Sequence, residues 1–292
     1  MSEMARGRRI KSEGDAFHHV MSRITGRQML LRDPAVKSDM IDALERVAEF
    51  SGVDVGGFCV MDDHFHVVCR VSKPEGPVPE NEILRRYAAL KGRDAAGRLC
   101  EHLAKMRKEG GALLAEERLD RLRRRMHDLS EFMKTFKEEF GRMFRKRRKY
   151  VGGLWGDRFK STLIGEAEYL RTCAKYVELN PVRAGLASRP EGYAWCTSGA
   201  AKRGSAFAKR CREFMAGVVC GVAGGDGSRD GWLWRRVPQI GSGRIFGSRE
   251  FVSATLLRHS ACVSPSARAR PVAGGSFASH GHVLAWLAAK AA

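Results

Sequence analysis

Two apolar runs separated by a short acidic turn limit how this chain can fold more than any other feature. Residues 53–61 and 64–71 are rich in Val, Phe and Cys, and an Asp-Asp pair stands between them. Such runs predict an antiparallel hairpin. Because side chains on a strand alternate between faces, His64 and His66 share one face. The pair is either the start of a divalent-metal site or a pair of surface histidines on an edge strand.

Three further segments place this hairpin in a larger sheet. Residues 17–23 and 159–164 read as strands, and an apolar stripe at helical spacing over 34–50 predicts a helix between the first strand and the hairpin. A second helix is predicted from Glu166 to about Asn180. Four strands with helices between them indicate an α+β fold, a split βαβ arrangement in which an antiparallel sheet carries its helices on one face.

The helix after the last strand carries a second set of chemically useful side chains. Tyr176 and Asn180 are four residues apart, so they project from one face of a helix that stops near Pro181. An amide oxygen beside two imidazoles can complete a metal site, and a phenol can attack a phosphorus atom. Glu178 is a weaker candidate for the third ligand, because it is rotated away from Tyr176 on the helix.

The charge of the chain favours a polyanionic partner. The 292 residues include 52 Lys and Arg against 33 Asp and Glu, a formal net charge of +19. Nucleic acid or an acidic membrane surface would suit this charge. No apolar run is long enough to span a bilayer and no secretory signal is visible, so we expect a cytoplasmic nucleic-acid-binding protein. Candidate phosphate contacts are Arg145, Lys146, Arg147, Arg148, Lys149, Arg158, Lys160 and Arg183.

At these residues the chain resembles a known family. His64-Phe65-His66 is similar to the HUH motif (His, hydrophobic, His) of single-tyrosine transposases. The run from Asn180 to Leu186, with Tyr176 four residues earlier, resembles the hallmark of the REP-associated tyrosine transposases. Segments 17–28, 153–161 and 193–198 resemble other parts of that family in the same order. The resemblance covers about residues 12–200.

The resemblance implies a ferredoxin-like fold, a homodimer, and cleavage and strand transfer of single-stranded, hairpin or palindromic DNA. On this hypothesis His64, His66 and Asn180 hold Mg²⁺ or Mn²⁺, and Tyr176 forms a 5′-phosphotyrosine bond. The phenol needs activation by the metal, by a cation such as Lys175, or by water. Tyr169 is the second choice for the nucleophile, because Tyr176, four residues before Asn180, has the spacing that the family shows.

The remaining segments are read as additions to this domain. A basic helical insertion is expected at about 81–150, an accessory region at 201–262, and a disordered tail at 263–292. Within the insertion, phenylalanines recur every four residues from Phe132 to Phe144, which indicates core packing rather than base stacking.

Two other functions stay open at this stage. The first is a nucleic-acid-binding protein of the same fold that has lost cleavage. The second is a metal-dependent hydrolytic nuclease in which Tyr176 is only structural. The acidic pair before His64 replaces the Pro-Asn that relatives usually have, which leaves the metal environment open.

Overall fold

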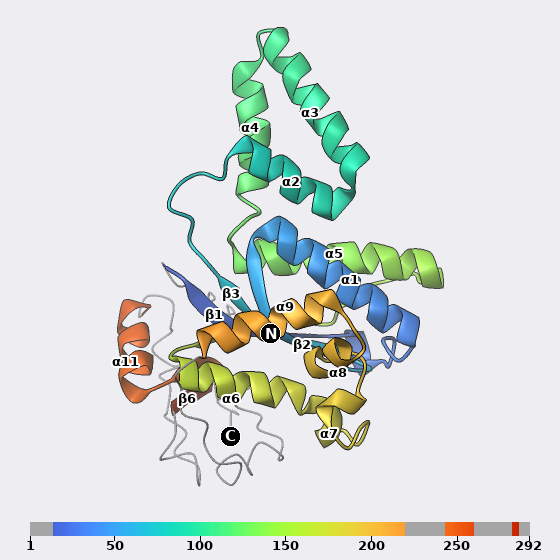
Figure 1. Ribbon diagram of the computed structural model, residues 1–292, viewed down its shortest axis with the longest axis vertical. Helices are drawn as coiled ribbons and strands as arrows, with labels where there is room; N and C mark the ends of the chain where they lie inside the picture. The colour runs from blue at the N-terminus through green and yellow to red at the C-terminus, as the bar shows by residue number, and fades with distance from the viewer. Residues whose placement is uncertain (1–13, 220–242, 260–281, 286–292) are drawn as a thin grey trace, which may run out of the picture.

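A six-stranded sheet forms the centre of the molecule (Figure 1). The computed structural model describes residues 14–219, 243–259 and 282–285. The strands lie in the order β2-β3-β1-β4-β5-β6 and are antiparallel except for β4 and β5, which are parallel. They are β1 (Ala16–Arg23), β2 (Val53–Val60), β3 (His64–Val71), β4 (Lys160–Ile164), β5 (Gly243–Gly247) and β6 (His282–Ala285). The prediction of an α+β fold, including the β2–β3 hairpin, is confirmed.

The helices follow the predicted pattern of local start and stop signals. At the start of α1 the Asp33 carboxylate accepts a hydrogen bond from the Ala35 N–H at 2.7 Å, and Gly52 ends the helix with a left-handed φ of 61°. Within the described ranges, no helix combines the length and the apolar character needed to cross a bilayer. The helices are α1 (Pro34–Ser51), α2 (Glu80–Lys91), α3 (Arg93–Lys108), α4 (Ala112–Arg123), α5 (Leu129–Arg148), α6 (Ala167–Glu178), α7 (Asn180–Arg183), α8 (Thr197–Lys202), α9 (Ala206–Val218) and α11 (Arg249–Arg258).

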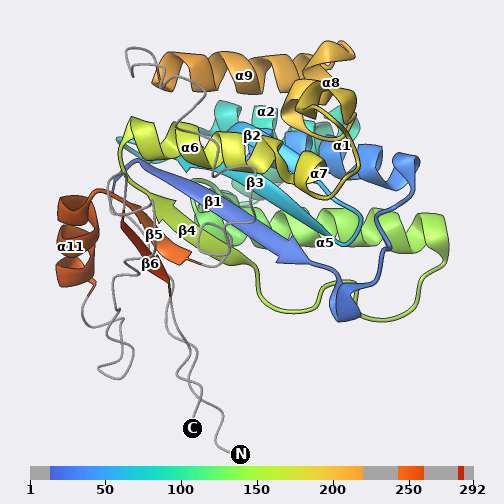
Figure 2. The same ribbon diagram turned by 90° about the horizontal axis from the view of Figure 1, so that it is seen from below.

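Helices cover both faces of the sheet rather than one. On β3, Phe65 and Val67 point into a core built with α1 and α5, whereas Val68 points into a second core that includes α6. Figure 2 shows α5 and α6 on opposite sides of the sheet. The prediction of helices on one face is therefore wrong. The reason is that the central strands carry apolar side chains on both faces, so helices have to bury each face.

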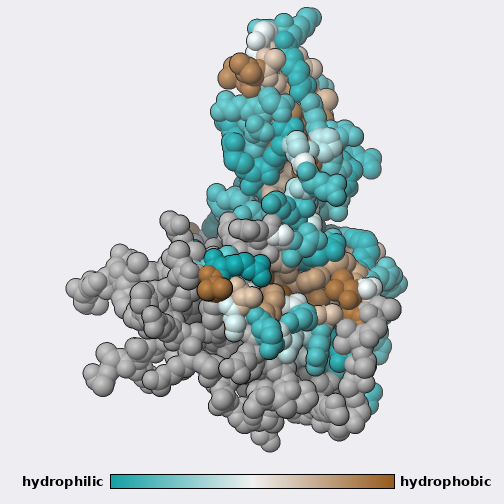
Figure 3. Space-filling model, turned by 90° about the vertical axis from the view of Figure 1, so that its left-hand side faces the viewer, coloured by the Kyte–Doolittle hydropathy of each residue, from teal (hydrophilic) through white to brown (hydrophobic). Residues whose placement is uncertain are grey.

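The predicted insertion divides into two parts. α2, α3 and α4 project from the sheet as a helical arm (Figure 1), held together by side chains such as Leu99, Leu103 and Leu119. The surface of this arm is mainly hydrophilic in the view of Figure 3. α5 instead packs against α1 in the main core, where Phe132, Phe136, Phe140 and Phe144 are all buried. The predicted core role of this phenylalanine stripe is confirmed.

The C-terminal region adds strands to the sheet. β5 pairs with β4, with Ile245 opposite Leu163, and β6 pairs with β5. Within the predicted tail, the structure describes His282–Ala285, which form β6. The rest of the predicted tail lies outside the described residues.

His18 on β1 makes the fold sensitive to acid. Its side chain is buried, its Nδ1 has no hydrogen-bond partner among the described residues, and burial lowers its pKa to about 4. The unfolded histidine has a pKa near 6.5 and takes up a proton first, so this group lowers stability as the pH falls from 6.5 toward 4. Between pH 7 and pH 5 a His18→Phe variant should lose about 2 kcal/mol less unfolding free energy than the wild type. Urea unfolding at both pH values measures this, and an unchanged pH dependence would contradict it.

Candidate active site

The two histidines of β3 lie side by side on the sheet face that α6 covers. The ring centroids of His64 and His66 are 5.0 Å apart, with their planes at 81°. His66 is buried, and His64 is half-buried. Burial, reinforced by the neighbouring His64, holds the pKa of His66 well below its usual value. His66 is therefore neutral at neutral pH, as a histidine that binds a metal must be.

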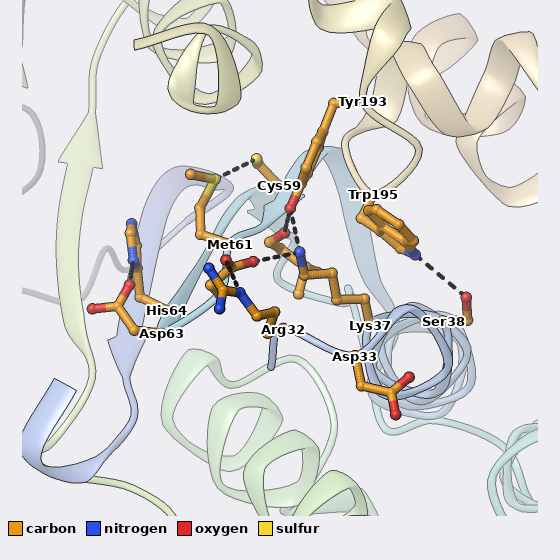
Figure 4. A network of polar contacts seen from close by, with 12 residues as sticks. Arg32, Asp33, Lys37, Ser38, Cys59, Met61, Asp63, His64, Tyr193 and Trp195 are labelled. Carbon is orange, nitrogen blue, oxygen red and sulfur yellow. Dashed lines mark hydrogen bonds and ion pairs between the residues drawn. The ribbon is translucent and has the colours of Figure 1, made fainter. Parts of the chain in front are cut away.

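Both rings are held through their Nδ1 atoms. The Asp63 carboxylate makes a short hydrogen bond with Nδ1 of His64 (Figure 4), and Arg23 lies 3.4 Å from the same carboxylate. The Nε2 atom of His19, on β1, lies 2.8 Å from Nδ1 of His66. Since Nδ1 is engaged on each ring, Nε2 is the nitrogen that His64 and His66 can offer to an ion.

Asp63 is ionised in this setting. Partial burial raises the pKa of its carboxyl, but the hydrogen bond and charge of His64 and the charge of Arg23 outweigh burial, so the pKa lies below its ordinary value. An ionised carboxylate can only accept a hydrogen bond, so its partner nitrogen must carry the proton. It therefore favours the His64 form that carries its proton on Nδ1.

A buried lysine fixes the turn that leads into His64 (Figure 4). Lys37 on α1 is only 3% exposed, and its Nζ lies 2.6 Å from the Asp62 carboxylate and 2.7 Å from the Tyr193 hydroxyl. That hydroxyl donates to the carbonyl at the end of β2 at 2.7 Å, and Nζ lies 4.7 Å from the Trp195 ring centroid. The network ties α1, the hairpin turn and the segment before α8 into one rigid support.

α6 places Tyr176 directly over the histidines. Its ring centroid is 6.1 Å from those of His66 and His19, in edge-on contact with both. Tyr176 is 5% exposed, so its phenol is enclosed between α6 and the sheet.

Arg183 lies on the Tyr176 ring. Its guanidinium is 4.2 Å from the ring centroid, and its Nη2 donates to the Tyr176 carbonyl at 2.5 Å. Burial lowers the pKa of Arg183, and attraction to Tyr176 opposes that shift. A guanidinium remains charged in proteins, and a cation beside a phenol favours its ionised form. Sequence reasoning assigned Arg183 to DNA and looked to Lys175 for this cation.

Asn180 is turned toward the end of α6. Its Nδ2 donates to the carbonyls of Tyr176 and Val177, both at 3.2 Å. Among the contacts recorded in the described residues, none joins Asn180 to His64 or His66. α6 ends at Glu178, and Asn180 begins the short helix α7. Its amide then satisfies carbonyls left open at the helix end.

The donor set fits a divalent ion in part. No group of three or more His, Cys, Asp or Glu side chains in the described ranges is arranged to hold a metal. The Nε2 atoms of His64 and His66 supply two suitable donors. Asn180 would add its Oδ1, because Nδ2 is the atom that the two carbonyls engage. Glu178 accepts from the Ser198 N–H at 3.2 Å through both carboxylate oxygens.

Tyr169 contacts strand β5. Its ring packs edge-on against Phe246 of β5, with centroids 5.1 Å apart. Burial and the nearby carboxylates of Glu168 and Glu166 raise the pKa of its phenol. A phenol whose ionisation is suppressed is the poorer nucleophile.

The basic run at the end of α5 is partly occupied by acidic neighbours. Arg147 pairs with Asp39 at 2.5 Å and 2.9 Å, and Arg148 pairs with Asp33. Such exposed ion pairs are weak, so a phosphate can replace the carboxylate. The other predicted phosphate contacts on α5, on the following loop and on β4 are exposed: Arg145, Lys146, Lys149, Arg158 and Lys160.

Sequence reasoning missed three side chains at this site, namely His19, Arg23 and Lys37. His19 is 47 residues from His66 in the chain, and only the pairing of β1 with β3 brings the two rings together. The one signal was a second pair of histidines in the first strand. Nothing in the sequence marks Lys37 as buried, because lysines on an amphipathic helix usually reach solvent.

Comparison with known proteins adds little beyond this geometry. No family model and no curated protein matches the chain. The solved structures that match include one described as a REP-associated tyrosine transposase bound to a REP hairpin, with 15% identity and a TM-score of 0.44, covering 76% of this chain and 93% of that one. This likeness is too distant for the role of any residue to be carried across.

Proposed function

We propose that this protein cleaves single-stranded DNA and transfers the cut strand, with Tyr176 as the nucleophile. The observation that carries the proposal is the meeting of a phenol, a neutral imidazole and a cation in Tyr176, His66 and Arg183. The pattern of these residues in the sequence also resembles the REP-associated tyrosine transposases. Tyr169 lacks such neighbours, which supports Tyr176 as the choice between the two.

The proposed step is an in-line displacement at a backbone phosphate. The Tyr176 oxygen bonds to phosphorus while the bond from phosphorus to the 3′ oxygen breaks, giving a 5′-phosphotyrosine and a free 3′-OH. The phenol releases its proton, and the leaving oxygen gains one, so the step is balanced. Since Tyr176 is enclosed, the phosphate has to enter between α6 and β3, which requires a shift of α6.

His64 and His66 would hold the divalent ion through Nε2, with Oδ1 of Asn180 as the third ligand. When bound, Mg²⁺ or Mn²⁺ would polarise the scissile phosphate and offset charge in the transition state. The residues of the chain do the rest: Asp63 orients His64, and Arg183 favours the ionised Tyr176.

The proposal extends to the fold and to the partners of the protein. We assign the first four strands, in the order β4-β1-β3-β2 with α1 and α5 on one face, to a ferredoxin-like plan. The exposed lysines and arginines of α5 and β4 would follow the DNA backbone, and hairpin DNA and a homodimer are the partners that the resemblance implies.

One observation favours a second candidate, a nucleic-acid-binding protein of the same fold that does not cleave. The Asn180 Nδ2 is engaged by carbonyls at the end of α6, and the described residues bring together no three His, Cys, Asp or Glu side chains for a metal. On that account DNA binds equally well with and without metal, and no covalent product forms.

A covalent-trapping experiment tests the proposal. The protein is incubated with labelled hairpin DNA from the flanks of its own gene and with Mn²⁺, then run on a denaturing gel. A shifted band that requires metal supports strand transfer. Cleavage without an adduct indicates a hydrolytic nuclease, and binding without either outcome indicates the non-cleaving protein.

Arg183→Gln should slow adduct formation about fivefold, because removing a cation–π partner costs on the order of 1 kcal/mol. The pH at which the rate reaches half its maximum should also rise, since the phenol loses its stabilising cation. Arg183→Lys should recover part of the rate. Single-turnover rates between about pH 6 and pH 10 measure both effects, and an unchanged pH profile in Arg183→Gln would contradict the role.

A further inference from the structure

His19 and His66 meet edge to edge. Their ring planes are within 10° of parallel and their centroids are 5.0 Å apart, yet His19 Nε2 and His66 Nδ1 are only 2.8 Å apart. Rings stacked face to face would not bring two edge atoms so much closer than their centroids. The two rings are therefore nearly coplanar, which is the geometry of a hydrogen bond between ring nitrogens.

The strands hold this contact rigidly. β1 and β3 are adjacent inner strands of the sheet, and both rings are buried. In the ladder Met21 lies opposite His66, which puts His19 diagonally across from it on the same face. Tyr176 covers both rings from α6. A buried side chain in such a setting keeps the orientation that its hydrogen bond gives it.

We propose that His19 is a positioning residue that accepts a hydrogen bond from Nδ1 of His66 and so keeps Nε2 of His66 unprotonated and aimed at a metal ion. The opposite direction would place the proton on Nε2 of His66 and remove its lone pair. His64 supplies an internal parallel, because Asp63 engages its Nδ1 in the same way. The two contacts together present a pair of Nε2 donors. This inference rests on the proposed function, since it concerns the same site.

The proton position is measurable without metal and without DNA. In ¹⁵N NMR spectra of the metal-free full-length protein near pH 7.5, His66 should carry its proton on Nδ1. In His19→Phe, which keeps a ring but has no acceptor, His66 should change to the form protonated on Nε2. In His19→Gln, whose amide oxygen can accept, His66 should keep the wild-type form. The matched control is His18→Phe, the adjacent buried histidine on the opposite face, which should leave His66 unchanged.

Mn²⁺ binding gives a second readout. Loss of a residue that orients a metal ligand typically weakens metal affinity about 10- to 100-fold. His19→Phe should therefore bind Mn²⁺ about 10- to 100-fold more weakly than wild type. His19→Gln should bind it within a few-fold of wild type. The inference is overturned if wild-type His66 is protonated on Nε2, if His19→Phe leaves its proton on Nδ1, or if His19→Phe binds Mn²⁺ as tightly as wild type. A wild-type protein that passes these tests but forms no DNA adduct would refute the proposed function and leave the role of His19 standing.

Discussion

A Tyr176→Phe variant is expected to form no covalent adduct with DNA, with a rate reduced by a factor on the order of 10³ or more. The substitution removes one hydroxyl and keeps the ring that contacts His66 and Arg183, so the fold should be retained. DNA binding should change only a few-fold, because the basic side chains on α5 and β4 are untouched. The measurement is the denaturing-gel assay with hairpin DNA and Mn²⁺, alongside a binding assay on the same DNA.

Tyr169→Phe is the matched control for this variant. It removes the same hydroxyl from the same helix, two turns earlier, where the ring packs on Phe246 instead of the histidines. It should form the adduct at nearly the wild-type rate. If the adduct persists in Tyr176→Phe and disappears in Tyr169→Phe, the nucleophile has been assigned to the wrong tyrosine.

Lys37→Met should cost about 3 to 5 kcal/mol of unfolding free energy, because it removes one partner of a buried ion pair. Methionine keeps the length and the contact with Trp195, but the Asp62 carboxylate and the Tyr193 hydroxyl lose their shared partner. Urea unfolding monitored by circular dichroism measures the loss. The turn before His64 should loosen as well.

Arg32→Gln is the control for the lysine. Arg32 contacts the same Asp62 carboxylate at 3.6 Å, but its side chain is 80% exposed, so its removal should cost less than about 1 kcal/mol. The double variant Lys37→Met/Asp62→Asn should recover part of the stability, since no unpaired charge is left. A Lys37→Met protein within 1 kcal/mol of wild type would show that the network does not support the turn.

The strands and helices could be predicted because their signals are local. Alternating apolar runs marked β1 to β4, and Asp33-Pro34 and Gly52 marked the ends of α1. Which face of the sheet α6 covers depends on packing between segments far apart in the chain. β5 and β6 were not predicted, because they are short and are recognised as strands only through the pairing of β5 with β4 and of β6 with β5.

Only those features of the site that lie within one strand or one helix could be predicted from the sequence. Strand periodicity put His64 and His66 on one face, and helix periodicity put Tyr176 on the next element. The role of Asn180 stays a prediction, because this residue lies beyond the end of α6 at Glu178. The cation beside Tyr176 is Arg183, the last residue of α7, and its contact with the ring depends on how α7 lies against α6.

Mapping the DNA-linked tyrosine by mass spectrometry tests the central claim most directly. The adduct is treated with nuclease and trypsin, and the peptides are searched for a bound nucleotide. Cleavage after Arg171 separates the two candidates, with Tyr169 in Ser161–Arg171 and Tyr176 in Tyr176–Arg183. We predict the nucleotide on Tyr176. A nucleotide on Tyr169, or DNA cut by the protein with no nucleotide on any peptide, would contradict the account.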